Sequence, residues 1–196
     1  MIDPSNITNF DRTDAELEEF ALFAPAVAGK TAKIQADKLD ELLDRLEVDY
    51  GEHSPFDLVL KAASDATLEN HMRAVKLGKY STLVPCYRAM ALVDRSGEHW
   101  LRTVDVETLK RYPGIGNKTA RFFVMHSRED ADVATLDTHV LSWMDENLDV
   151  NVHERAPRSD REYERLEHHF LQECENRGRH PAHLDLEIWN SKSKSK

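Results

Sequence analysis

The sequence predicts an all-α fold, and three observations support that class. Gly and Pro number only seven each in 196 residues, which disfavours a turn-rich β-sandwich and low-complexity disorder. Apolar residues recur at helical spacing along most of the chain. The stretch 148–152 alternates apolar and polar residues, but five positions are too few for a strand that we would defend. We therefore expect about nine or ten helices and no sheet.

The individual helices follow from apolar faces and from start and stop signals. Residues 14–27 place apolar side chains at positions i, i+3, i+4 and i+7, although Pro25 predicts a kink or an early end. Ser54 and Pro55 form a helix start, and Pro85 suits a first turn better than an interior. The other predicted helices cover residues 32–46, 56–75, from after 78 to 93, 105–111, 117–126, 136–147, 161–177 and 181–189. The helix at 56–75 is expected to break near 64–65. A short helical piece is expected at 96–103, and the tail at 191–196 is expected to be mobile.

Composition excludes several classes of protein. No apolar run approaches the roughly 20 residues of a membrane span, and the first ten residues lack the basic and apolar regions of a secretory signal. The two cysteines, Cys86 and Cys174, cannot supply a disulfide framework or a four-cysteine iron–sulfur site. We expect an intracellular protein without a membrane partner.

The charge of the chain is unevenly distributed. A net charge of −10 argues mildly against nucleic acid as a partner. However, residues 73–88 carry four Lys or Arg and no acid, and residues 110–121 carry four more without an acid. A globally acidic protein can therefore still present a basic face to a phosphate backbone.

The most informative motif is LKRYPGIGNKTAR at residues 109–121. Pro113 ends a short helix, and Gly114 and Gly116 permit positive φ and the close approach of another chain. A second helix starts near Asn117, where its first N–H groups and its dipole would form an anion site. A plain αα-hairpin uses the same Pro and Gly, but basic flanks favour a clamp for DNA phosphate. These flanking residues are Lys110, Arg111, Lys118 and Arg121.

A lysine and a carboxylate stand at a suggestive spacing in this region. Lys118 lies in the first turn of the second helix, and Asp137 follows 19 residues later in LDTHV. A helix of about ten residues and a short return loop would bring both side chains to opposite walls of one cleft. A simple ion pair is the alternative.

The arrangement resembles the helix-hairpin-helix DNA glycosylases of the endonuclease III and 8-oxoguanine glycosylase superfamily. YPGIGNKTA is similar to the family's L-P-G-V-G-x-K-T-A hairpin, with Tyr112 in place of Leu, and LDTHV is similar to its V-D-T-H-V segment. The resemblance covers roughly residues 17–145 and implies two helical subdomains with the active-site cleft between them. The expected subdomains are residues 31–126, with the helix-hairpin-helix at 105–126, and residues 1–30 together with 127–196.

Two departures narrow the resemblance to one branch of the family. Endonuclease III usually carries a four-cysteine iron–sulfur cluster after the aspartate, whereas only Cys174 follows Asp137 here, so we expect no iron–sulfur cluster and no other cofactor. Adenine glycosylases lack the lysine that Lys118 matches. The ending DLEIWNSKSKSK and the segment AVAGK at 26–30 resemble the compact archaeal-type 8-oxoguanine glycosylases.

The resemblance also implies roles for the matched residues. Lys118 would attack C1′ of the damaged nucleotide and form a Schiff base, and Asp137 would stabilise positive charge on the sugar or assist deprotonation. Burial and the helix N-terminus would favour the neutral amine that this attack needs. The expected DNA contacts are Lys79, Lys110, Tyr112, Pro113, Gly114, Ile115, Gly116, Asn117, Thr119 and Arg121, with a monovalent cation on the carbonyls of Tyr112 and Ile115. The expected base pocket comprises Ala28, Gly29, Lys30, His139, Trp189 and Lys196.

The expected activity is base excision repair of damaged double-stranded DNA by a monomer, in the cytoplasm on the nucleoid, or in the nucleus of a eukaryote. The enzyme would excise oxidised purine, above all 8-oxoguanine, and nick the abasic site by β-elimination. A second interpretation keeps this chemistry but targets oxidised pyrimidines. A third is a non-catalytic DNA-binding module, against which Lys118 and Asp137 count.

Overall fold

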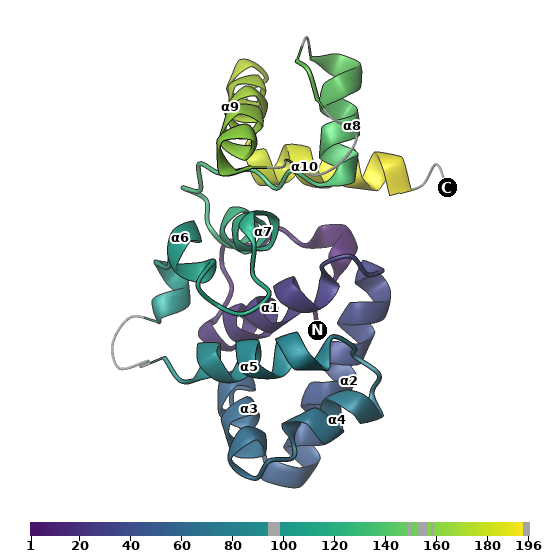
Figure 1. Cartoon of the computed structure of the whole chain (residues 1–196), viewed down its shortest axis with the longest axis vertical. Helices are drawn as coiled ribbons and strands as arrows, with labels where there is room; N and C mark the ends of the chain where they lie inside the picture. The colour runs from purple at the N-terminus through teal and green to yellow at the C-terminus, as the bar shows by residue number, and fades with distance from the viewer. Residues whose placement is uncertain (94–98, 149, 153–156, 158, 194–196) are drawn as a thin grey trace. The chain divides into compact units, whose positions relative to one another are not determined.

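The computed structural model describes residues 1–93, 99–148, 150–152, 157 and 159–193 (Figure 1). Over these residues it contains ten α-helices, two 3₁₀ turns and no strand, so the predicted all-α class is confirmed. The chain divides into two compact units. Unit 1 comprises residues 1–4 and 11–116, and unit 2 comprises residues 5–10 and 117–196.

Unit 1 is built around a buried helix, α1 (Asp14–Val27), which contacts α2, α3, α5 and η2. Every residue from 20 to 26 is apolar and buried, with Phe20, Leu22 and Phe23 almost fully so, as expected of a helix segment surrounded by others. Thr13 and Glu16 form a capping box that fixes its start. The other elements of unit 1 are α2 (Ala32–Tyr50), α3 (Pro55–Ser64), α4 (Leu68–Ala74), α5 (Tyr80–Ala91), the 3₁₀ turn η2 (Trp100–Arg102) and α6 (Val106–Leu109).

The two prolines within helices behave differently from what the sequence predicts. Pro25 lies inside α1 and does not end it, and Pro85 lies inside α5 rather than in its first turn. Each proline removes one intrahelical hydrogen bond, yet both helices continue past it to Val27 and Ala91. Only residues 99–103 of the short piece predicted at 96–103 are described, and they contain η2.

Unit 2 packs three helices onto α10 (Pro181–Ser193), namely α7 (Asn117–Ser127), α8 (Thr138–Asn147) and α9 (Asp160–Asn176). Figure 1 shows α10 passing across the ends of α8 and α9. The core between α8, α9 and α10 includes Leu141, Met144, Tyr163, Leu166, Phe170, Leu184 and Ile188.

The last helix is longer than predicted, because α10 continues to Ser193 through half of the tail expected to be mobile. Lys192 supports this extension, since its Nζ lies 2.6 Å from Glu146 Oε1 and 3.0 Å from Ser142 Oγ on α8. Residues 194–196 lie outside the described residues.

The boundaries of the two units differ from the boundaries of the expected subdomains. α1 belongs to unit 1 because it packs on α2, α3 and α5, and α7 belongs to unit 2 because it packs on α10. The segment 5–10 joins unit 2, where the Asn9 N–H donates to the His126 carbonyl at 3.2 Å.

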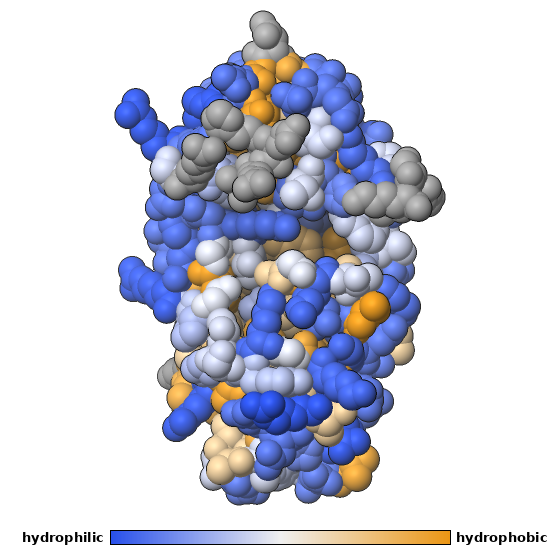
Figure 2. All heavy atoms as spheres, turned by 45° about the vertical axis from the view of Figure 1, so that its right-hand side comes forward, coloured by the Kyte–Doolittle hydropathy of each residue, from blue (hydrophilic) through white to orange (hydrophobic). Residues whose placement is uncertain are grey.

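The surface carries few large apolar side chains. The face in Figure 2 is mostly hydrophilic, and its apolar residues lie in separate areas. No helix in the described parts of the chain combines the length and apolar composition that a membrane crossing needs. The large apolar residues exposed among those described are Met1, Ile34, Val48 and Leu92.

Candidate functional site

The turn of the predicted motif belongs to unit 1 and is tightly packed. The Ile115 N–H donates to the Tyr112 carbonyl at 3.1 Å, with Pro113 and Gly114 between them. Gly114 has φ of +79°, so the order Pro then Gly matches a type II turn. A Cβ at Gly114 would lie 2.2 Å from Thr82 Cγ2 at the start of α5. Glycine is therefore required here for both the turn and the packing within unit 1.

Gly116, the second glycine of the motif, differs from the first. It does not have the positive φ that the sequence suggested, and a Cβ built there would meet nothing within 4 Å. Its backbone is exposed, so a ligand can approach it closely. The next residue, Asn117, begins α7 and belongs to unit 2.

Other residues of the turn are partly engaged within unit 1. Lys110 is half-buried and its Nζ lies 2.9 Å from Glu107 Oε1. The half-buried Tyr112 ring packs against Trp100, with 5.8 Å between ring centroids. The carbonyls of Tyr112 and Ile115 were expected to hold a monovalent cation. The Tyr112 carbonyl accepts the hydrogen bond of the turn, and the residue Ile115 is buried. Pro113 is exposed.

One face of α7 is buried, and it carries two of the residues that we expected to contact DNA. Arg121 is only 8% exposed, and Thr119 is buried beside it. Arg121 donates to Glu167 Oε1 at 2.8 Å and to Asn117 Oδ1 at 2.9 Å, and its guanidinium lies 4.5 Å from the centre of the Tyr163 ring. The structure therefore places Arg121 in the interior of unit 2.

The same buried network holds the segment that leads to Asp137. Glu167 Oε1 also accepts the Ala134 N–H at 2.7 Å. The Tyr163 hydroxyl donates to the Ala134 carbonyl and accepts the Leu136 N–H, both at 2.9 Å. Sequence reasoning missed Tyr163 and Glu167, although a glutamate on the apolar face of a helix was a signal for a buried partner.

Asp137 is the N-cap of α8. Its Oδ1 accepts the N–H groups of His139 and Val140, both at 2.8 Å. The side chain is half-buried, and Oδ2 has no hydrogen-bond partner among the described residues. Asp137 therefore holds its carboxyl group in a fixed position at the start of α8.

Lys118 lies in the first turn of α7 and is exposed. The burial that we expected for it is not observed, because the buried face of α7 is the one that carries Thr119 and Arg121. Among the described residues Lys118 forms no hydrogen bond or ion pair. Its ammonium group is therefore available to a ligand.

Unit 2 also contains a buried carboxylate, Asp185 of α10, whose Oδ2 lies 3.2 Å from His126 Nε2. Burial raises the pKa of Asp185, and the charge of Asp137 raises it further, whereas the hydrogen bond and charge of His126 and the charge of Lys118 lower it. The charges of Lys118 and Asp137 therefore have opposite effects on this carboxyl group. Sequence reasoning missed Asp185, although it is the first residue of the ending DLEIWNSKSKSK.

Two residues of the expected base pocket lie near this cluster. Trp189 is half-buried and lies four residues after Asp185 on α10, so the two side chains share one face of the helix. His139 is half-buried in the first turn of α8 and gives its N–H to Asp137. Lys196, the third residue expected from the C-terminal region, lies outside the described residues.

The other expected pocket residues belong to unit 1, at the end of α1. Ala28 is the C-cap of this helix, Gly29 follows with φ of +70°, and Lys30 is exposed. The ammonium of Lys79 donates to the carbonyls of Pro25 and Ala28. Lys79 thus binds the C-terminal carbonyls of α1, and its expected contact with DNA stays a prediction.

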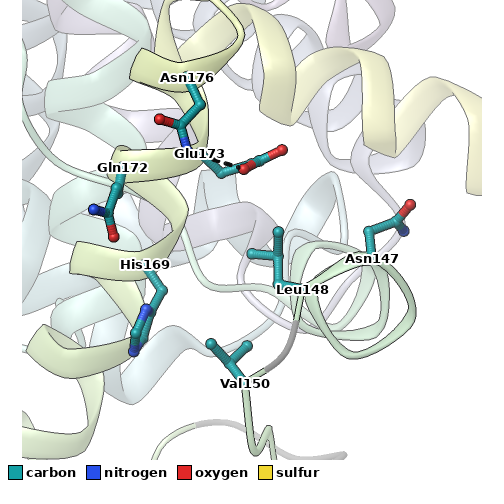
Figure 3. A pocket seen from close by; sticks show the side chains of 7 residues that line it. All are labelled: Asn147, Leu148, Val150, His169, Gln172, Glu173 and Asn176. Carbon is teal, nitrogen blue, oxygen red and sulfur yellow. Dashed lines mark hydrogen bonds between the residues drawn. The ribbon is translucent and has the colours of Figure 1, made fainter.

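The structure offers few alternatives to this cluster. No group of three His, Cys, Asp or Glu in the described parts of the chain could hold a metal ion. Burial raises the pKa values of Cys86 and Cys174 to about 12, so neither thiol is a nucleophile at neutral pH. A surface pocket of about 270 Å³ in unit 2 contains none of the expected site residues (Figure 3). It is lined by Asn147, Leu148, Val150, His169, Gln172, Glu173 and Asn176.

No family model matches the chain, and comparisons with curated proteins and with solved structures found no match. The functional assignment therefore depends on the residues and their geometry.

Proposed function

We propose that this chain is a DNA repair enzyme of the helix-hairpin-helix class that combines glycosylase and abasic-site lyase activities. The particular reaction is removal of an oxidised purine, above all 8-oxoguanine. The observation that carries this proposal is that unit 2 holds the exposed Lys118 in the first turn of α7 and the helix-capping Asp137 at the start of α8.

The proposed DNA anchor is the backbone around Gly116. Nothing would crowd a phosphate oxygen there, and the N–H groups of the first turn of α7 are suited to bind an anion. Phosphate contacts of this kind hold the DNA without reading its sequence. The anchor would place the damaged nucleotide near Lys118, which lies two residues further along.

The proposed chemistry needs no metal ion. The target base is first flipped out of the duplex. The neutral amine of Lys118 attacks C1′, the C1′–N bond to the base breaks, and the base leaves with a proton. Opening of the sugar ring gives a protonated imine, loss of a C2′ proton then breaks the C3′–O bond, and water releases Lys118. Asp137 stabilises the positive charge on the sugar and on the imine.

The proposed stacking surface for the flipped base is Trp189. A flipped base loses its stacking partners, and an aromatic side chain replaces them with about 1–3 kcal/mol per base. Trp189 shares a face of α10 with Asp185 and remains half-exposed, so it is suited to this role.

A strand-cleavage assay tests the proposal. Duplexes would carry 8-oxoguanine, thymine glycol or a preformed abasic site, and an undamaged duplex serves as the control. We expect cleavage of the 8-oxoguanine and abasic duplexes. Cleavage at thymine glycol instead of 8-oxoguanine would indicate an enzyme for oxidised pyrimidines. Binding without any cleavage would leave only a DNA-binding module and would contradict the proposal.

A further inference from the structure

His180 lies where three segments of unit 2 meet. Its ring packs against Phe10 of the segment 5–10, with 4.9 Å between ring centroids. Its Nε2 lies 3.0 Å from the carbonyl oxygen of Glu129, in the link between α7 and α8. Its Nδ1 accepts the Ala182 N–H at 3.1 Å, at the start of α10. One half-buried imidazole thus joins the N-terminal segment, the α7–α8 link and α10.

His180 occupies the N-cap position of α10. Its carbonyl accepts the N–H groups of His183 and Leu184 at 3.0 and 3.1 Å, as the carbonyl of an N-cap residue does. Pro181 takes the first helical position, where its missing N–H leaves no helical bond unmade. The imidazole Nδ1 therefore supplies the acceptor that a Ser, Thr, Asp or Asn side chain supplies at most helix starts.

The two hydrogen bonds of the ring define its protonation state. A carbonyl oxygen can only accept, so Nε2 must carry the hydrogen that it donates to Glu129. A backbone N–H can only donate, so Nδ1 must carry no hydrogen when it accepts from Ala182. Both bonds are therefore compatible with one tautomer of the neutral ring. They are incompatible with the imidazolium, which has a hydrogen on each nitrogen.

The surroundings of the ring also favour its neutral form. Burial is the largest cause that lowers the pKa of His180, and the charges of His183 on α10 and His126 on α7 lower it further. The hydrogen bond to the Glu129 carbonyl and the charge of Glu129 act in the opposite direction, and the net effect is a lowered pKa. The segment 5–10 presents the uncharged Phe10 to the ring.

We propose that His180 is a pH-sensitive N-cap, which fastens the start of α10 to the segment 5–10 and the α7–α8 link while its ring is neutral and releases it when the ring is protonated. Protonation at Nδ1 replaces the acceptor of the Ala182 N–H with a second donor, so this bond breaks. It also places a positive charge at the N-terminus of α10, where the helix dipole disfavours it. Acid therefore frays the first turn of α10 and loosens its contact with Phe10. The device does not depend on the repair activity proposed above.

The direct test is a pH titration followed by NMR. The nitrogen chemical shifts of the His180 ring report which nitrogen carries the hydrogen, and the protection of the Ala182 N–H against hydrogen exchange reports the cap. The variants are His180→Asn, which keeps an acceptor at every pH, and His180→Ala, which has none. His168→Asn is the matched control, because His168 is an exposed histidine on α9 of the same unit. Thermal melting of each variant identifies any loss of fold.

We expect the neutral ring to carry its hydrogen on Nε2 and to titrate below the ordinary histidine pKa of about 6.5. As the ring is protonated, protection of the Ala182 N–H should fall by about 2- to 30-fold, the range for loss of an N-cap. In His180→Asn the protection should stay high over the same pH range, and in His180→Ala it should be low already at neutral pH. His168→Asn should lose protection like the unmodified protein.

Three results would overturn the inference. The first is a neutral ring with its hydrogen on Nδ1. The second is a His180 pKa at or above the ordinary value, which a cation stabilised by the Phe10 ring would produce. The third is an equal loss of protection in His180→Asn, which would place the acid-sensitive group elsewhere. The first two are measured on the unmodified protein, so they decide the question even if a variant does not fold.

Discussion

Each unit contains a buried pair of a histidine and a carboxylate, and the two pairs have different surroundings. In unit 1, His99 Nε2 lies 3.0 Å from Glu18 Oε1, and the side chains are 5% and 3% exposed. The other oxygen of Glu18 accepts the Phe56 N–H at 2.9 Å, and His99 Nδ1 accepts the Leu101 N–H at 3.4 Å. The pair therefore ties α1, α3 and η2 together.

In unit 2, the pair of His126 and Asp185 has a similar hydrogen bond but meets other charges. The carboxyl of Asp185 lies within electrostatic reach of Lys118 and Asp137, and Lys118 is exposed. A buried pair whose oxygens both bond within the core serves the fold. The following predictions separate residues that serve the fold from residues that are proposed to serve the chemistry.

The largest effect on stability is expected in unit 1. Glu18→Ala leaves the buried His99 ring and the Phe56 N–H without their partner, and loss of one member of a buried pair costs about 3–5 kcal/mol. Urea unfolding should show this decrease in the free energy of unfolding. A cost below about 1 kcal/mol would mean that the pair does not hold the three elements together.

Asp137→Asn should separate stability from activity in unit 2. Asn and Asp are similarly good N-caps, so the oxygen that receives the N–H groups of His139 and Val140 is retained and the variant should stay folded. Removal of the charge should lower excision of 8-oxoguanine by about 100-fold. Near-normal excision by the folded variant would show that Asp137 only caps α8.

The two glycines of the hairpin should respond in opposite ways. In Gly114→Ala the new side chain would have to adopt a positive φ and would clash with the methyl group of Thr82. The backbone conformation alone should lower the free energy of unfolding by about 1–2 kcal/mol. Gly116 has neither a positive φ nor a close neighbour. The stability of Gly116→Ala should therefore hardly change, while its affinity for DNA should fall. Thermal melting and DNA binding should be measured on both variants. Equal melting temperatures would contradict the tight packing at Gly114, and unchanged binding by Gly116→Ala would contradict the phosphate anchor.

The smallest effect concerns the pH dependence of stability. Burial raises the pKa of Asp185, so its contribution to stability is present below the unfolded-state pKa of about 3.9 and is lost as the pH rises through the raised value. The hydrogen bond from the Thr13 backbone lowers the pKa of Glu16, so its contribution is present at neutral pH and is lost as the pH falls.

Urea unfolding of Asp185→Asn and Glu16→Gln between about pH 3 and pH 7 measures both contributions. The stability difference between the unmodified protein and the variant should decrease with rising pH for Asp185→Asn and increase for Glu16→Gln. The same sign for both would show that Asp185 is not penalised by burial.

Local features of this chain were predictable from its sequence, whereas long-range partners were not. The start of α1, the break between α3 and α4 and the Pro–Gly turn before α7 follow from signals a few residues long. Arg121 shows the limit, because its neighbours in the motif indicated a DNA contact while Glu167, 46 residues away, buries it.

The same limit applies to the candidate site. Lys118 and Asp137 were found because they belong to recognisable motifs. Asp185 and Thr8 gave no such signal, since an aspartate among Leu and Ile and a threonine near the N-terminus are common. Only the packing of α10 and of the segment 5–10 on α7 brings them together at His126.

The central claim is that Lys118 forms a covalent imine with damaged DNA. The most direct measurement incubates the protein with an 8-oxoguanine duplex and borohydride and locates the DNA-linked residue by mass spectrometry. We predict a single adduct on Lys118, and no adduct with Lys118→Gln although that variant still binds the duplex. An undiminished adduct in Lys118→Gln, or linkage at another lysine, would contradict the account.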